Sequence, residues 1–165
     1  MYCKVQDFIS DFKEESQKTL QIFNSLTDSS LSAKVYSEGR NIETICRHII
    51  WSLVDMLKTF GLEEMHHQKD QRFENVQEIV RAYQEQTEKV LNHIPNVISD
   101  NQLEDEVEIY GEKWTKKQVL YGFLKHEIHH RAQITVLMRQ SGLKVPGIYG
   151  PSKEEWKNYG MEPEE

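Results

Sequence analysis

The chain has 165 residues and a formal net charge of −7, from 20 Lys and Arg against 27 Asp and Glu. This length fits one domain over residues 1–165, which can bury about 70% of its unfolded surface. The acidic balance disfavours non-specific nucleic-acid binding, which depends on basic patches, so we expect no nucleic-acid partner.

The segments that direct or anchor proteins to membranes are not evident in the sequence. Residues 1–7 lack the apolar core of a signal peptide, and no stretch approaches the roughly 18 uninterrupted apolar residues of a membrane span. The two cysteines, Cys3 and Cys46, are too few and too far apart for a disulfide framework. We therefore expect a cytoplasmic protein that does not bind membranes, with Cys46 as a core residue.

Apolar residues recur at helical spacing in four long segments. The first is residues 5–26. The second begins at Asn41, a plausible N-cap, and runs to Gly61. The third spans residues 75–94 and is closed by Pro95. Thr115 caps the fourth, which runs to about Ser141 and stops at Gly142.

The connections between these segments carry different signals. Residues 63–73 are polar and contain the adjacent pair His66 and His67. Adjacent helical positions point about 100° apart, so this pair suits a solvated loop better than a shared metal site. Residues 106–115 alternate around Gly111, which predicts a short hairpin or extended connection. The turn-rich tail, residues 145–151, is expected to wrap back over the helices. Together the segments predict an all-α four-helix bundle.

The fourth segment contains two histidines, His126 and His130, one helical turn apart on the same face. On a helical wheel they fall within the apolar stripe formed by residues such as Phe123 and Leu137. An unpaired polar ring is costly there, and a divalent metal would satisfy both rings. Hydrogen bonds to neighbours in an ordinary core are the alternative. Catalytic zinc sites typically use three protein ligands, so the pair alone leaves both readings open.

His48, in the second segment, is a candidate for the third ligand. Bundle cores build metal sites from side chains on facing helices. On its wheel His48 lies at the border between the apolar and polar faces. Periodicity is therefore compatible with a half-open pocket and with plain solvent exposure.

The fourth segment reads HEIHHRAQ at residues 126–133 and is followed by Gly142, Pro146 and Tyr149. In this stretch, and in the order of its helices, the sequence resembles the DinB family of the DinB/YfiT-like metalloproteins. It is similar to the family's H-x-x-x-H pair followed by Arg-Gly-Gln and to its Gly-x-x-x-Pro-x-x-Tyr pattern, with Ala132 where the family often has glycine. The resemblance implies an up-down-down-up bundle, usually dimeric.

The resemblance also implies a metal triad of one histidine from the second helix and the H-x-x-x-H pair from the fourth. In this chain these are His48, His126 and His130. His129 points about 100° away from His130, so we expect it outside the triad, at the pocket rim, at an interface or exposed. Gln133 is better placed to hydrogen-bond within the site. Asp55 is a candidate acceptor for the other N–H of His48.

A second apolar strip, Leu124 and Ile128, lies opposite the histidines on the same helix. A bundle helix normally exposes that side, so a second buried contact is expected there. A homodimer interface would supply it, and the resemblance favours this reading. A covering loop or the C-terminal tail is the alternative.

Three neutral imidazoles leave positions open on an ion for water or a substrate atom. Such a metal lowers the pKa of bound water to about 7 or holds a thiol as its thiolate. The resemblance implies a thiol S-transferase, in which a low-molecular-weight thiol such as bacillithiol or mycothiol attacks a small electrophile. A metal-dependent hydrolase and a non-catalytic metal-binding stress-response protein are the alternatives. Zinc and nickel both suit imidazole ligands, and the sequence assigns no catalytic residue beyond the ligands.

Overall fold

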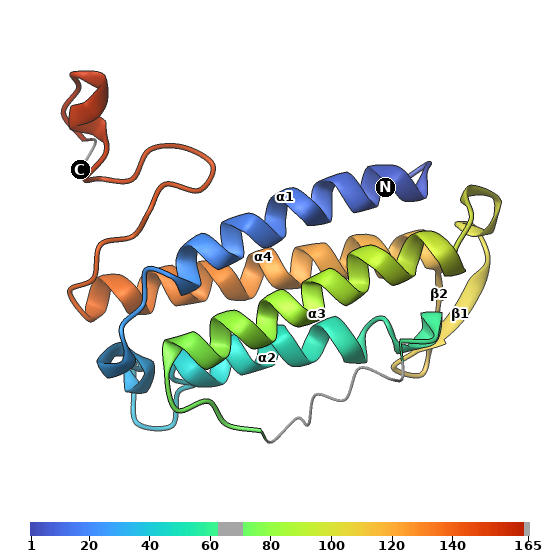
Figure 1. Cartoon of the computed structure of the whole chain (residues 1–165), viewed down its shortest axis with the longest axis horizontal. Coiled ribbons are helices and arrows are strands. Elements are labelled where there is room, and N and C mark those ends of the chain that lie inside the picture. The colour runs from blue at the N-terminus through green and yellow to red at the C-terminus, as the bar shows by residue number, and fades with distance from the viewer. Residues whose placement is uncertain (63–70, 164–165) are drawn as a thin grey trace.

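Four long helices dominate the computed structural model, which describes residues 1–62 and 71–163. They are α1 (Val5–Phe23), α2 (Ile42–Asp55), α3 (Val76–Val97) and α4 (Lys116–Gln140). Figure 1 shows α1 and α4 running in one direction and α2 and α3 in the other. This is the predicted up-down-down-up four-helix bundle. The predicted loop at His66 and His67 lies outside the described residues.

Neighbouring helices in the bundle are not always neighbours in sequence. Both α1 and α2 pack against α3 and α4. The helix α2 therefore lies beside α4, although α3 and the connections on either side of it separate the two in the chain. This arrangement sets two distant segments face to face.

Polar side chains fix where the helices begin. The side chain of Asn41 accepts a hydrogen bond from the Thr44 amide at 2.8 Å, and Asn75 plays the same part at the start of α3. Thr115 forms a reciprocal capping box with Gln118 at the start of α4. Each cap satisfies an N–H that the first helical turn leaves unpaired. The predicted caps Asn41 and Thr115 are confirmed.

The predicted end of α3 at Pro95 was wrong, because the helix continues to Val97. Proline lacks an N–H, so one intrahelical hydrogen bond is lost there. The next residues still bond, since the Ile98 amide donates to the Ile94 carbonyl at 3.1 Å. Both isoleucines are buried in the core. Burial on either side of Pro95 therefore holds the last turn in place.

Two other helices end earlier than periodicity suggests. The α-helix α1 ends at Phe23, yet Leu26 is still buried just beyond it. The α-helical part of α2 ends at Asp55, and the short 3-10 helix η2 (Lys58–Phe60) then reaches Gly61 at φ 77°. Apolar spacing continued past both ends because the connecting turns also contribute to the core.

A two-stranded hairpin precedes α4, as the alternating pattern of residues 106–115 predicted. Strands β1 (Glu106–Ile109) and β2 (Glu112–Thr115) are antiparallel. Tyr110 and Gly111 link them with φ of 53° and 78°, the left-handed pair that a type I′ turn requires. The Tyr110 hydroxyl donates to Asp55 at 2.7 Å, so the hairpin is tied to the end of α2.

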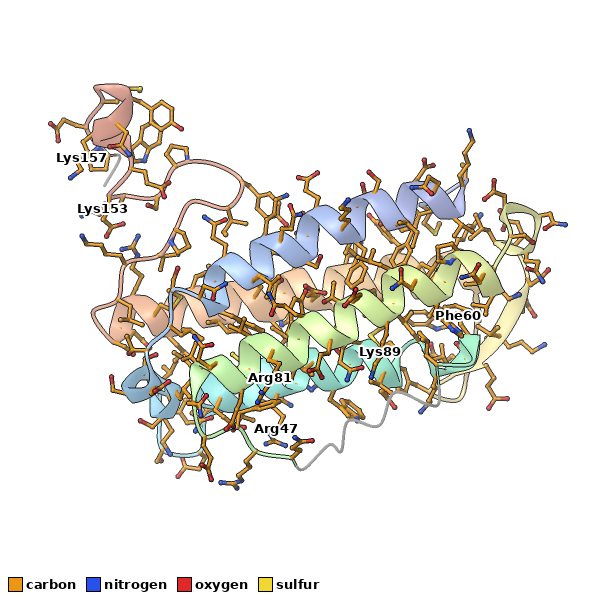
Figure 2. All side chains as sticks on the ribbon, viewed as in Figure 1. Arg47, Phe60, Arg81, Lys89, Lys153 and Lys157 are labelled. Carbon is orange, nitrogen blue, oxygen red and sulfur yellow. The ribbon has the colours of Figure 1, made fainter. Side chains whose placement is uncertain are left out.

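The core is largely apolar, and the outer surface of the bundle is charged. Phe8, Phe12 and Phe123 form an aromatic cluster between α1 and α4. Charged side chains such as Arg81 and Lys89 lie exposed on α3 (Figure 2). Cys46 is fully buried, as predicted.

The strip opposite the histidines is largely covered within the single chain. Leu124 is buried, because α4 packs against α1 as well as α2. Ile128 is half-buried and lines a small pocket with Ile148 and Tyr149 of the tail. The second buried contact expected on this strip is therefore present, and α1 and the tail supply much of it within one chain. The homodimer stays a prediction.

Beyond these contacts the tail runs away from the bundle. Its last 3-10 helix, η4 (Trp156–Tyr159), projects past the end of the helices with Lys153 and Lys157 (Figure 2). Among the described residues, no helix is both long and apolar enough to cross a membrane.

Candidate metal centre

The structure brings His48 of α2 together with His126 and His130 of α4. The Nε2 atom of His126 lies 3.1 Å from Nε2 of His48 and 3.2 Å from Nε2 of His130. One nitrogen of each ring lies within 4.8 Å of the other two. The three residues thus form one compact group, which we call the histidine cluster.

The histidine cluster fits a divalent metal. Zinc–nitrogen bonds of about 2.0–2.1 Å in a tetrahedral site place ligand nitrogens about 3.3 Å apart, close to the separations observed here. The Nε2 atom of His126 also faces two other ring nitrogens at once. A single ion between the rings would satisfy all three lone pairs, whereas hydrogen bonds between them require protons on the facing atoms.

Gln133 orients one of these rings. Its Oε1 lies 2.8 Å from Nδ1 of His130, so the ring donates its Nδ1–H to the amide oxygen. The lone pair of Nε2 is then left for the histidine cluster, as in metal sites where a partner fixes the tautomer. The amide nitrogen of Gln133 lies 3.1 Å from Nε2 of the exposed His129. His129 therefore stands outside the histidine cluster, in the place that the wheel predicted.

Burial favours the neutral form of two of the ligand rings, His126 and His130. Desolvation, together with the positive potential of His130, His129 and Arg40, lowers the pKa of His126 to about 4. Burial also lowers the pKa of His130. Metal ligation requires neutral imidazole, so both rings are in the competent state at pH 7. Nδ1 of His126 is buried without a hydrogen-bond partner among the described residues.

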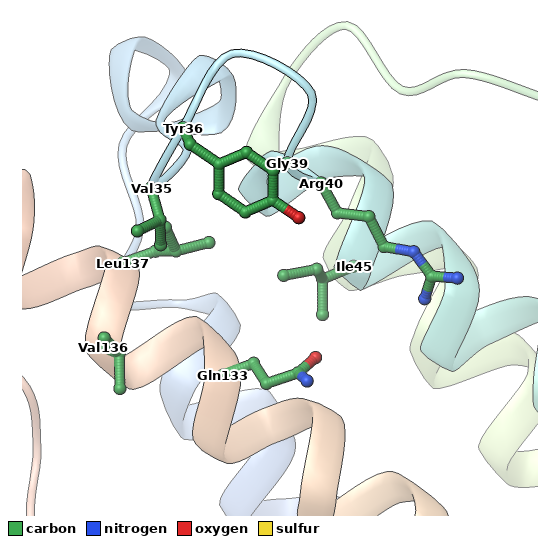
Figure 3. Close-up of a pocket in the computed structure, with 8 residues that line it drawn as sticks. All are labelled: Val35, Tyr36, Gly39, Arg40, Ile45, Gln133, Val136 and Leu137. Atoms are coloured by element: carbon green, nitrogen blue, oxygen red, sulfur yellow. The ribbon is translucent and has the colours of Figure 1, made fainter.

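Two pockets border the histidine cluster. The larger, about 400 Å³, is lined by Gln133, whose side chain contacts His130 (Figure 3). The smaller, about 130 Å³, contains His48 itself together with Thr44 and Trp51. Arg40 lines both. Sequence reasoning missed Arg40 because it stands in a polar connection without periodicity.

Asp55 has partners of its own at the end of α2. Its carboxylate accepts hydrogen bonds from Tyr110 and, at 2.8 Å, from Lys58. These contacts tie the hairpin to the helix. A bond from Asp55 to His48 stays a prediction.

Comparison with known proteins adds to this geometry. The DinB family model matches residues 1–165. The chain belongs to the DinB family. It is 30% identical over 163 residues to the uncharacterized protein YrdA of Bacillus subtilis strain 168, covering 98% of each chain.

Solved DinB-like structures share the fold. A DinB-like protein from Bacillus cereus ATCC 10987 is 27% identical, with a TM-score of 0.85 over 90% of this chain and 100% of that one. YfiT from Bacillus subtilis is 20% identical, with a TM-score of 0.67 over 83% of this chain and 87% of its own. YfiT is described as a probable metal-dependent hydrolase with an unusual four-helix bundle topology. At that identity the likeness shows the fold alone.

The DinB-like arginine and tyrosine meet in space on the side of α4 away from the histidine cluster. Arg131 is buried and forms an ion pair with Glu15 of α1. The Tyr149 hydroxyl lies 2.5 Å from the Arg131 guanidinium and 2.6 Å from the Glu15 carboxylate. The Lys18 ammonium lies 4.4 Å above the Tyr149 ring. These contacts anchor the tail to α1 and α4, as the tail prediction anticipated.

Glu127 follows His126 on α4, and its side chain points into the core. It is 1% exposed, and its Oε1 accepts hydrogen bonds from Tyr83 and, at 2.6 Å, from Thr19. Burial raises the pKa of its carboxyl group. Ala132, the departure from the family glycine, is exposed beside the tail. The alanine side chain is thus accommodated without disturbing the histidine cluster.

Proposed function

We propose that the protein binds zinc or nickel through Nε2 of His48, His126 and His130. We further propose that it is a thiol S-transferase, in which a low-molecular-weight thiol attacks a small electrophile. The convergence of the three rings supports the first step. The two neighbouring pockets, one lined by His48 and one by Gln133, support the second.

A bound divalent metal supplies Lewis acidity, which lowers the pKa of a thiol or of water. The chain's own residues orient a ligand ring and give the site a positive potential. Gln133 holds the His130 ring in the tautomer that presents Nε2. The positive side chain of Arg40 adds a field that favours a nearby anion.

A transfer between two substrates needs two places beside the reacting atoms, and the larger and smaller pockets provide them. This is the observation that carries the proposal. In the transfer, the sulfur–carbon bond forms while the bond from that carbon to its leaving group breaks. The leaving group departs with the bonding electron pair, and the thiol proton passes to solvent. A thiol, with a pKa near 8.5, needs far less help to ionise than water.

Hydrolysis is the second candidate, favoured by the description of YfiT. It would use water in place of the thiol. It requires only one occupied pocket, so the second pocket would have no substrate role.

Elemental analysis of the purified protein tests the ligand set. We expect about one divalent metal per chain in the wild type and a loss of most of it in His48→Ala and His130→Ala. His129→Ala is the matched control and should keep its metal, since His129 lies outside the histidine cluster. Equal metal in all four proteins would overturn the site, and loss in His129→Ala alone would show that the wrong histidine was chosen.

Turnover separates the two reactions. Metal-loaded protein is mixed with chlorodinitrobenzene and a panel of low-molecular-weight thiols, and separately with p-nitrophenyl acetate without thiol. The proposal expects thiol-dependent turnover that His126→Ala abolishes. Release of p-nitrophenol without thiol, and no thiol conjugation, would favour hydrolysis and overturn the transferase.

A further inference from the structure

The larger pocket beside the histidine cluster is polar at one end and apolar at the other. Figure 3 shows Arg40 and the amide of Gln133 on one side of the pocket, with Ile45 beside them and the Arg40 guanidinium at the outer edge, and Val35, Val136 and Leu137 on the other side. Gln133 contacts His130, so the polar end is the one beside the histidine cluster. A ligand that fills the pocket therefore meets the reactive centre with its polar end.

The apolar end exposes surface that a ligand would cover. Val35, Tyr36 and Val136 are 61%, 64% and 55% exposed. Removing such surface from water is favourable, and ligand pockets are typically lined in this way. The volume of about 400 Å³ lies within the usual range for small-molecule sites.

Arg40 gives the polar end a positive charge. It is exposed, and no ion pair or hydrogen bond joins it to another described residue. A planar guanidinium binds a carboxylate through two parallel hydrogen bonds. A phosphate dianion usually takes several donors, whereas a single arginine matches a monoanion.

A tight turn sets the position of Tyr36. The Gly39 amide donates to the Tyr36 carbonyl at 2.9 Å. A Cβ on Gly39 would lie only 3.1 Å from that carbonyl oxygen and 3.2 Å from two carbons of the Tyr36 ring. The ring packs directly over Gly39, so any larger residue displaces this wall of the pocket.

We propose that the larger pocket takes an electrophilic substrate with a carboxylate beside Arg40 and an apolar body against Tyr36 and Leu137. This assignment names the substrate class of the proposed transferase and rests on that function for the reaction itself. The smaller pocket, with His48 in its wall, is left for the thiol.

Calorimetric titration with octanoate, butyrate, octanol and octyl phosphate tests the assignment in metal-loaded and chelator-treated protein. We expect octanoate to bind more tightly than octanol, and each methylene added from butyrate to octanoate to strengthen binding up to about fourfold. Arg40→Gln should weaken octanoate about fivefold and leave octanol unchanged. Arg139→Gln, which removes a charge that is already paired with Glu154 and does not line the pocket, should change neither.

Variants at two glycines test whether the Tyr36 ring forms a wall of the pocket. Gly39→Ala should weaken octanoate and octanol alike, because it moves the Tyr36 ring. Gly150→Ala is the matched control, since a Cβ there has no neighbour within 4 Å. Equal binding of octanol and octanoate, tighter binding of octyl phosphate, or no effect of Arg40→Gln would each overturn the assignment.

The chelator-treated arm keeps the two proposals distinguishable. Octanoate binding that depends on Arg40 without metal supports the pocket even if metal analysis fails. Normal metal content with no octanoate binding overturns the pocket and leaves the metal site standing.

Discussion

Replacing Arg131 by methionine should destabilise the protein strongly without removing its metal site. Arg131 is 2% exposed, and its guanidinium donates to the Glu15 carbonyl at 2.9 Å and to Thr19 at 3.2 Å, besides its ion pair with the Glu15 carboxylate. Methionine fills similar volume but leaves Glu15 buried without this partner. Removing one member of a buried ion pair costs about 3–5 kcal/mol.

The structure argues for the lower end of that range. Lys18 remains 2.8 Å from the other oxygen of Glu15, so part of the charge stays compensated. A cost of about 3 kcal/mol corresponds to a fall in Tm of about 6–12 °C for a domain of this size. Thermal unfolding of the metal-free protein, followed by circular dichroism, measures it.

Arg139→Met is the matched control, because Arg139 also lies on α4 but pairs with Glu154 at the surface. Exposed pairs contribute about 0–1 kcal/mol, so its Tm should fall by no more than about 4 °C. Both variants should retain wild-type metal content. A fall in Arg131→Met no larger than in Arg139→Met would refute the reasoning. Adding Glu15→Gln to Arg131→Met should recover part of the loss, because the buried Glu15 carboxylate that has lost its arginine is then removed.

Three further predictions follow from the same contacts. The pKa of His126 is about 4 in the folded protein and 6.5 in the unfolded chain, so the unfolded state binds the extra proton between these values. The metal-free protein should therefore lose stability as pH falls from about 6.5 to 4, and His126→Asn should flatten that part of the Tm–pH profile. Tyr149→Phe removes the hydroxyl that donates to Glu15 but keeps the ring over Lys18, so its Tm should fall by about 2–4 °C; an unchanged Tm would contradict the anchoring role. Zinc in excess should raise the Tm of the wild type and not that of His48→Ala, and equal shifts would show binding elsewhere.

Local signals predicted the elements well. Asn41 and Thr115 start helices because their side chains cap within three residues, which the sequence alone reveals. The pair His126 and His130 meets because helical geometry fixes residues four apart. The hairpin follows from Gly111 and the alternation around it. Each of these depends on neighbours in the chain.

Contacts between helices were harder to predict. Periodicity left His48 at the edge of a face, and only the family resemblance selected it, because the choice depends on α2 lying beside α4. The wheel predicted a second buried contact at Leu124 but left open what supplies it, because the packing of α4 against both α1 and α2 is not visible in the sequence. The pairing of Arg131 with Glu15 likewise joins residues 116 positions apart, which no local pattern records.

The histidine cluster also bears on the order of events during folding. His126 and His130 are available to an ion as soon as α4 forms, but His48 lies 78 residues from His126 along the chain. Closing a loop of that length has an entropic cost that must be met before the third ring arrives. Ligation by all three histidines therefore requires α2 and α4 to have docked. The loop that this docking closes contains α3 and the hairpin. Tight binding of the proposed metal would therefore require an assembled bundle, and chains in which α2 and α4 have not docked would bind it only weakly.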